Sequence, residues 1–237
     1  MLLGLHHLTA LAGDPQVVLD ECTGARKLRL VKRTVNFDDP GSYHFYFGDH
    51  RGSPGTLLTL FTGFQRQAKR GAGQIVSGLD LDCITLCESD PEPTARVLEI
   101  LGFRSAGVEE NRHRFELPEG AARVDILHEP QIERGKMGVG AVHHVAFRVS
   151  DETVQADWRT KLIDAGVHVS PVKDRLYFHS IYFREPGGVL FEIATDPPGF
   201  TADESVEELG KHLKLPEWLE PQRAKIEQIL PKIKLPK

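Results

Sequence analysis

The sequence is short of cysteine and has no excess of positive charge. Its three cysteines, Cys22, Cys83 and Cys87, cannot all form pairs and lack zinc-finger spacing, so we expect reduced thiols and a cytoplasmic location. Acidic residues outnumber basic ones and give a formal net charge of −5, which argues against a basic nucleic-acid-binding surface. The chain also lacks the run of roughly 18 apolar residues that a membrane span requires and the N-terminal pattern of a signal peptide. We therefore expect neither nucleic acid nor a membrane as a partner.

The chain does contain a histidine pair that occurs twice, in strand-like segments. The pairs are His6-His7 and His143-His144, and a lone carboxylate, Glu192, lies in the apolar run 189–194. Burying an unpaired carboxylate is unfavourable by on the order of several kcal/mol, so metal binding is the simplest explanation for Glu192. Two imidazoles and one carboxylate hold Fe(II) on one side and leave other positions open for substrate and O2. This set of residues predicts a metal-dependent, ring-cleaving dioxygenase.

Strand geometry makes one histidine of each pair the ligand. Successive side chains of a strand point to opposite faces, so both members of a pair face one cavity only where a β-bulge intervenes. A single histidine in a strand is more often a structural residue than a ligand. The repetition of the pair, together with Glu192, favours metal binding here.

The chain also repeats a larger unit of one strand, one helix and about three strands. Segments 44–61 and 179–195 match each other as a strand, a Pro/Gly turn and an apolar strand. Each follows a His-His strand and a helical segment, which we expect at 14–27 and at 151–165. A third copy lies between these two units. The predicted units are 1–66, 78–130 and 141–200, and a helical arm follows at 201–237.

Four stretches of the chain carry a family resemblance: Gly4–Gln16, Leu28–Gly41, Asp174–Phe200 and Val206–Gly210. They resemble the vicinal-oxygen-chelate superfamily of glyoxalase, bleomycin-resistance and extradiol dioxygenase proteins. Within it they are most similar to the bacterial hydroquinone-type ring-cleaving dioxygenases. The resemblance implies an α+β fold of βαβββ modules, in which the first and last modules close a metal-holding barrel.

The resemblance also implies the residues of the site and its partners. The expected metal is Fe(II), with Mn(II) or another divalent metal as the alternative, and the expected substrates are O2 and a small aromatic molecule. The implied ligands are His7, His144 and Glu192; Tyr182 and Arg175 line the substrate side, and His6, Thr9 and His143 lie close behind the ligands.

Several of these side chains have structural alternatives. Tyr182 could be a core tyrosine with a satisfied hydroxyl, and Arg175 could pair with Asp174 instead of an anionic substrate. We expect His179 and its first-unit counterpart, His44, to be structural residues.

The sequence departs from the family pattern in two places. Three modules are present where family members usually have four, and the second is apparently missing between about Gln74 and Gly78. In the first helix, Glu21 and Cys22 replace an apolar and an aromatic residue, and Lys27 stands where a glycine is expected.

The middle unit is expected to be a scaffold. Asp82-Cys83 takes the place of the histidine pair and Asp125 falls near the place of the carboxylate, but a second metal site is the less favoured interpretation. An uncovered apolar face would need a partner, so we predict a homodimer through this unit, with folding back of the arm as the alternative. The apolar residues concerned are Leu79, Leu81, Ile84, Leu86, Phe115, Leu117, Val124 and Ile126.

Three other functions remain as alternatives to a dioxygenase. A glyoxalase-like metal-dependent isomerase or lyase typically has a fourth protein ligand, but Thr59 aligns with Glu192 at that position. A metal-free binding protein of the bleomycin-resistance kind would not depend on the three ligands. Loss of one module could also have left an inactive relic.

Overall fold

The computed structural model describes residues 1–77 and 83–235, and the elements of these ranges form three βαβββ units. The first unit contains β1 (Leu5–Leu11), α1 (Pro15–Asp20) with its continuation as a π-helix (Glu21–Ala25), β2 (Arg29–Asn36), β3 (Asp39–Gly48) and β4 (Leu57–Phe61). The middle unit contains β6 (Cys83–Glu88), α2 (Glu92–Ile100), β7 (Arg104–Glu109), β8 (Arg112–Glu116) and β9 (Arg123–His128). The last unit contains β10 (Val142–Val149), α3 (Glu152–Asp164), β11 (Lys173–Asp174), β12 (Phe178–Arg184) and β13 (Leu190–Pro198). One further strand, β5 (Gln74–Ser77), precedes the middle unit.

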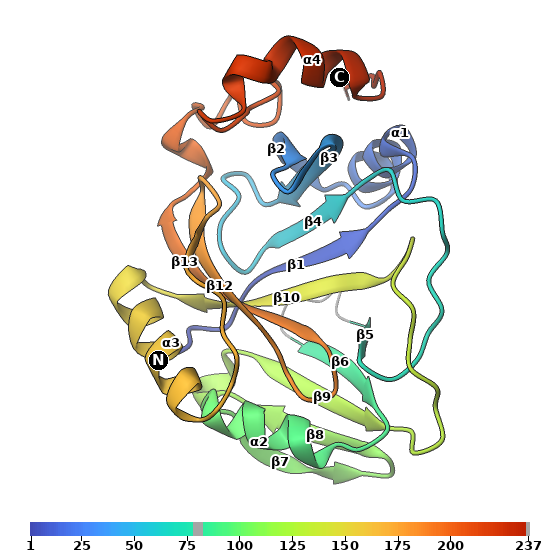
Figure 1. Cartoon of the computed structure of the whole chain (residues 1–237), viewed down its shortest axis with the longest axis vertical. Helices are drawn as coiled ribbons and strands as arrows, with labels where there is room; N and C mark the ends of the chain where they lie inside the picture. The colour runs from blue at the N-terminus through green and yellow to red at the C-terminus, as the bar shows by residue number, and fades with distance from the viewer. Residues whose placement is uncertain (78–82, 236–237) are drawn as a thin grey trace.

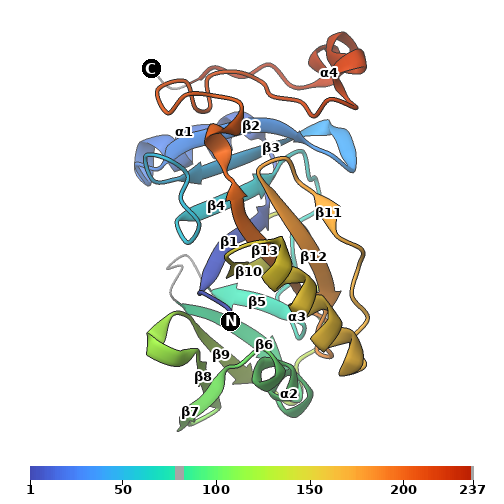
Figure 2. The same cartoon turned by 90° about the vertical axis from the view of Figure 1, so that its left-hand side faces the viewer.

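The strands form two sheets, which follow one another along the long axis of the molecule (Figure 1). The larger sheet has the order β11-β12-β13-β10-β1-β4-β3-β2 and the smaller one the order β5-β6-β9-β8-β7. Antiparallel pairing of β1 with β10 joins the first and last units in the centre of the larger sheet. Figure 2 shows α2 and α3 beside each other, and side chains of both helices share one core with both sheets. The predicted α+β fold of βαβββ modules is confirmed.

Two β-bulges interrupt the central β1–β10 pairing, and each contains the first histidine of a pair, His6 or His143, which we call the outer histidines. Leu5 pairs with Phe147 and His7 with Ala146, so His6 is an extra residue in β1. Thr9 pairs with His144 and Ala10 with Val142, so His143 is an extra residue in β10. The bulges therefore relax strict alternation at both histidine pairs, as simultaneous orientation towards one site requires.

The middle unit does not present the apolar face from which a homodimer was predicted. Ile84, Leu86, Val124 and Ile126 are fully buried, and they pack in the core that α2 and α3 share with both sheets. Phe115 and Leu117 belong to the same core, whereas Leu79 and Leu81 lie outside the described residues. The premise of an uncovered apolar face was wrong, because the sheet turns this face towards its own helix and the rest of the chain.

β5 occupies the edge of β6 that a symmetric partner would need. It pairs antiparallel with β6, as β1 pairs with β10, so it has the position of the first strand of a further unit. A two-fold pairing of β6 with the β6 of another copy would have to displace β5. A second copy of the chain therefore cannot pair with β6 in the way that β1 pairs with β10 unless β5 moves away.

The C-terminal arm covers the outer strands of the first unit (Figure 1). Of the predicted helical arm, α4 (Arg223–Ile229) is α-helical, with short 3-10 turns at Phe200–Ala202 and Glu220–Gln222, and most of the remainder is turns. Leu215, Leu219 and Ile226 pack with side chains of β2 and β3. The buried Lys32 of β2 binds Asp203 at 2.6 Å and also contacts Glu204. Among the described helices, none is long and apolar enough to cross a membrane.

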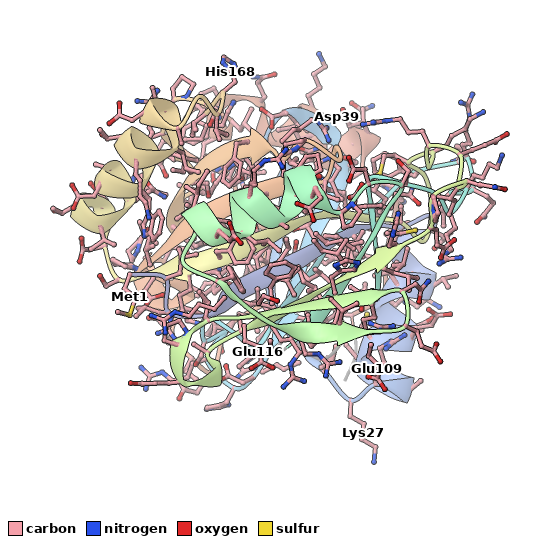
Figure 3. All side chains as sticks on the ribbon, turned by 90° about the horizontal axis from the view of Figure 1, so that it is seen from below. Met1, Lys27, Asp39, Glu109, Glu116 and His168 are labelled. Atoms are coloured by element: carbon pink, nitrogen blue, oxygen red, sulfur yellow. The ribbon has the colours of Figure 1, made fainter. Side chains whose placement is uncertain are left out.

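The departures in the first helix have local consequences. Cys22 is buried in the core beneath the arm, whereas Glu21 is exposed. Lys27 has a positive φ of 54°, a conformation that explains the glycine expected there. Figure 3 shows the Lys27 side chain pointing away from the body of the protein.

Candidate metal centre

Three buried side chains bring one potential ligand atom each to a common point. His7 Nε2 lies 3.2 Å from His144 Nε2, and Glu192 Oε2 lies 3.0 Å from His144 Nε2 and 3.4 Å from His7 Nε2. In the described part of the chain this is the one group of three His, Cys, Asp or Glu residues with ligand atoms this close, all within 4.8 Å. Glu192 Oε2 is buried without a hydrogen-bond partner. A buried carboxylate oxygen beside two imidazole nitrogens fits a divalent metal.

Three adjacent strands of the larger sheet position these ligands. His7 lies on β1, His144 on β10 and Glu192 on β13, and β10 pairs with both of the other strands. Glu192 lies beside Ala146, two residues after His144, so both ligands face the same side of the sheet. The first and last units thus supply the three side chains, as the resemblance implied.

Each histidine ligand is held by the histidine before it. Nδ1 of His6 lies 2.9 Å from Nδ1 of His7, and Nδ1 of His143 lies 2.8 Å from Nδ1 of His144. If each ligand ring donates through Nδ1, its Nε2 has a lone pair for the metal. The outer rings are then acceptors and must be neutral at Nδ1.

Burial keeps both outer histidines neutral. It lowers the pKa of His6 to about 3, with a further contribution from His7. Burial likewise lowers the pKa of His143 to about 3, assisted by His144. Neither ring is therefore expected to take up or release a proton near neutral pH. Orientation of the ligand rings is the role that the geometry supports.

The Glu192 carboxylate is fully buried and ionised. Burial alone would raise its pKa, but His7 and His144 together lower it well below the usual value. Its second oxygen, Oε1, accepts a hydrogen bond from the Ser180 hydroxyl at 2.5 Å. Sequence reasoning missed Ser180, although the residue lies two positions before Tyr182 and therefore shares its face of β12.

A cavity of about 360 Å³ opens onto two of the three candidate ligands, His7 and His144. Its aromatic walls include Tyr46, Phe61 and Phe178, and its floor includes His7 and His144. A larger hollow, of about 1020 Å³, is lined by the opposite face of β1, including Leu8, and none of the three ligands lines it. The smaller cavity is therefore the one that belongs to the candidate centre. Its size and lining suit a single aromatic ring.

Arg175 and Tyr182 form one polar wall of this cavity. Arg175 Nε donates to the Tyr182 hydroxyl at 3.1 Å, and its guanidinium also lies 3.4 Å from Asp38 Oδ2 on the β2–β3 turn. The acid that pairs with Arg175 is Asp38 and not Asp174 as the alternative held; the Asp174 carboxylate accepts from the Leu176 backbone. Burial and the nearby Glu192 charge raise the pKa of Tyr182, so its hydroxyl stays protonated.

Two threonines and a histidine near the candidate ligands form a hydrogen-bonded group. Thr9 Oγ1 lies 2.8 Å from Thr59 Oγ1, which also lies 2.9 Å from His44 Nε2. Thr59 pairs with Thr9 as Glu192 pairs with Ala146, which places it at the pseudo-symmetric position of the carboxylate. His44 lines the cavity, so our assignment of a purely structural role to it was incomplete.

Among the described residues, the corresponding position in the middle unit shows no cluster of metal ligands, and Asp82 lies outside the described residues. Asp125 pairs with Thr85 in the register that Glu192 and Ala146 share. Its carboxylate is engaged by Arg112 at 2.9 Å and by Arg114 at 3.0 Å. Two guanidinium groups thus engage the carboxylate that a second metal site would need, and the scaffold role of this unit stays a prediction.

Known proteins resemble this chain in sequence and in structure. The profile of the glyoxalase/bleomycin resistance protein/dioxygenase superfamily matches residues 81–193. MhqO of Bacillus subtilis (strain 168), which is named as a ring-cleaving dioxygenase, is 37% identical over 296 aligned positions that cover 95% of each chain. The chain belongs to this superfamily. Chlorohydroquinone/hydroquinone 1,2-dioxygenase of Sphingobium indicum is another relative within it, 32% identical with 92% of each chain covered.

Solved structures of superfamily members agree with the fold. The structure of a Bacillus subtilis protein described as a dioxygenase matches with a TM-score of 0.92 and 34% identity, covering 100% of this chain and 99% of the other. A glyoxalase I variant from maize, at 12% identity and a TM-score of 0.61 over 81% of this chain and 92% of its own, shares the fold alone. The predicted relationship to ring-cleaving dioxygenases is confirmed.

The comparison with MhqO also bears on the missing unit. Its alignment is 59 positions longer than this entire chain. MhqO therefore contains residues that have no counterpart here, as expected if this superfamily member has lost one internal unit.

Proposed function

We propose that this protein is an Fe(II)-dependent dioxygenase that opens the ring of a hydroquinone or catechol type substrate with O2. The observation that carries the proposal is the convergence of His7, His144 and Glu192 beside an aromatic-lined cavity. The names of the relatives support the reaction class, since one of them is a hydroquinone dioxygenase. Two neutral donors and one anionic donor also suit a divalent cation.

The three ligands would hold the metal on one side, and the cavity would admit the substrate on the other. When bound, Fe(II) would supply a centre at which a substrate hydroxyl and O2 are brought together. His6 and His143 would keep the ligand rings in orientation through their Nδ1 atoms. The aromatic side chains of the cavity would pack against the substrate ring and exclude water.

Tyr182 is the proposed hydrogen-bond donor to the substrate side. Because its oxygen accepts from Arg175 Nε and its pKa is raised by burial, the phenol keeps its own proton available for donation. A donor aimed at an oxygen that gains negative charge stabilises the transition state. Arg175 would in addition attract the phenolate form of the substrate by its charge.

Among the alternative functions, the isomerase has the least structural support. A fourth protein ligand would be expected opposite Glu192, where Thr59 instead makes hydrogen bonds to Thr9 and His44. A metal-free binding protein would leave Glu192 Oε2 buried without a hydrogen-bond partner, which is unfavourable.

The direct test is oxygen uptake by Fe(II)-loaded protein with a panel of hydroquinones and catechols, followed by identification of the ring-opened acids. The proposal predicts uptake in proportion to substrate consumed and none in a Glu192→Gln variant. Metal binding without oxygen uptake on any phenol of the panel would contradict it, and conversion of a thiol conjugate of an α-ketoaldehyde would support the isomerase instead.

A further inference from the structure

Each of the three candidate ligands has one outer hydrogen-bond partner, and the partner of Glu192 differs in kind from the other two. His6 and His143 contact Nδ1, the ring nitrogen on the far side of the ligand atom. Ser180 contacts Oε1, an atom that is itself able to bind a metal. The Ser180 contact therefore affects whether Glu192 can bind a metal through one carboxylate oxygen or through both.

The contact is well defined by its surroundings. Ser180 is fully buried on β12 and pairs with Ala194 on β13, two residues along each strand from the pair of Tyr182 with Glu192. Its hydroxyl lies 2.5 Å from Oε1, whereas Oε2 lies 3.0 Å and 3.4 Å from the two imidazole Nε2 atoms. An ionised carboxylate only accepts hydrogen bonds, so the serine must be the donor.

We infer that Ser180 keeps Oε1 away from the metal, so that Glu192 binds through Oε2 alone. The inference rests on the proposed metal site. Carboxylates bind metals through one oxygen or through both, and a second bound oxygen would occupy a position that substrate or O2 needs. Ser180 is thus a positioning residue that preserves an open coordination position.

A purely structural role of Ser180 makes a different prediction. If the hydroxyl only satisfies a buried oxygen, its removal lowers stability and leaves the coordination of the metal unchanged. If it merely orients the whole carboxylate, its removal weakens metal binding by roughly 10 to 100-fold, as for other outer partners, again with unchanged coordination.

The test is the coordination number of Co(II)-loaded protein, measured from its visible d–d absorption, in the parent and in Ser180→Ala. We expect the variant to lose absorption intensity, as Co(II) does when it gains a ligand atom. Its affinity for Co(II) should stay within about tenfold of the parent, because the second oxygen compensates for the lost orientation. Its affinity for azide, a small anion that probes the open position, should fall by at least about tenfold.

Thr195→Val is the matched control, because it removes another buried hydroxyl from the same pair of strands. Thr195 Oγ1 contacts the His179 and Pro197 backbone and not Glu192. This variant should melt at a lower temperature and keep the Co(II) spectrum and azide affinity of the parent. Ser180→Cys, which retains a weak donor in a similar volume, should shift the spectrum in the same direction by a smaller amount.

The outcomes separate the inference from the proposed function. A parent protein that binds no Co(II) would contradict the metal site and the inference together. A parent that binds Co(II), with the same spectrum in Ser180→Ala and Ser180→Cys, would overturn the inference alone. If Ser180→Ala does not fold, the spectrum of Ser180→Cys decides.

Discussion

We expect metal retention to depend most on Glu192. It supplies the single negative charge among the three ligands, and it is buried between the two imidazole Nε2 atoms. Glu192→Gln keeps the shape but replaces the anion with a neutral amide, so we expect iron retention to be lost while the fold persists. Metal analysis after dialysis, combined with circular dichroism, checks this. A variant that retains as much iron as the parent contradicts the assignment.

Tyr182→Phe separates substrate chemistry from metal binding. The variant removes a protonated hydroxyl that Arg175 holds at the cavity wall. We expect normal iron content and a turnover that is slower by roughly 10 to 1000-fold, the range for one lost donor to developing negative charge. Steady-state oxygen uptake at saturating substrate measures the change. An unchanged rate with a lower melting temperature would support the alternative that Tyr182 is a structural residue of the core.

The histidine pairs and Glu192 could be predicted from the sequence because repetition distinguishes them from the other histidines of the chain. Ser180 and the contact of Arg175 with Asp38 could not, because they depend on which side chains meet across strands. His44 was misjudged through its alignment with His179, which lies on the other side of the sheet near Glu152. Pseudo-symmetry relates backbone positions and does not preserve side-chain surroundings.

At the scale of elements, periodicity and caps located the last unit closely. The helix expected at 151–165 is α3 at Glu152–Asp164, and Asp151 caps it by accepting from the Val154 N–H. From the sequence, a β-bulge could be named only as the condition under which both histidines of a pair face one cavity. Its presence could not be predicted, because an extra residue in a strand leaves little trace in the hydrophobic pattern. The direction in which the middle sheet turns its apolar face was misjudged, since it depends on the packing of α2 and α3.

The end of β6 carries a buried carboxylate that should make stability depend on pH. Glu88 is 2% exposed, and burial, followed by repulsion from Glu185, raises its pKa to about 8 from 4.5. Between these values the folded protein holds a proton that the unfolded chain releases. The free energy of unfolding should therefore fall as the pH rises from 4.5 to 8, by up to about 1.4 kcal/mol per pH unit from this residue.

Glu88→Gln should remove this dependence. The variant keeps a neutral side chain at every pH, so we expect a melting temperature above that of the parent at pH 8 and close to it at pH 5. Thermal unfolding of the metal-free protein at both pH values measures the difference. Glu116→Gln, on the surface of the same sheet, is the control and should leave the pH dependence intact. Parallel pH profiles of the parent and Glu88→Gln would contradict the prediction.

For the molecule as a whole, the homodimer stays a prediction that sedimentation or light scattering at low micromolar concentration will test. A charge at Ile126 would not disperse such a dimer, since this side chain is fully buried in the core of its own chain. We instead expect Ile126→Glu to lower the free energy of unfolding by more than about 3 kcal/mol, because it buries an unpaired charge. Chemical denaturation measures this. A folded, equally stable variant would show that the face is open after all.

The antiparallel join of β5 to β6 has a consequence for the modular construction of the chain. β5 lies beside β6 in the position of a first strand. The smaller sheet therefore contains an antiparallel pair of first strands, as the larger sheet does in β1 and β10. The three candidate ligands lie on β1, β10 and β13 of the larger sheet. The spacing of these side chains therefore depends on the β1–β10 and β10–β13 pairings of the larger sheet and not on the hydrogen bonds between β5 and β6. A substitution that weakens the pairing of β5 with β6 should therefore disturb the smaller sheet first and leave the spacing of His7, His144 and Glu192 unchanged.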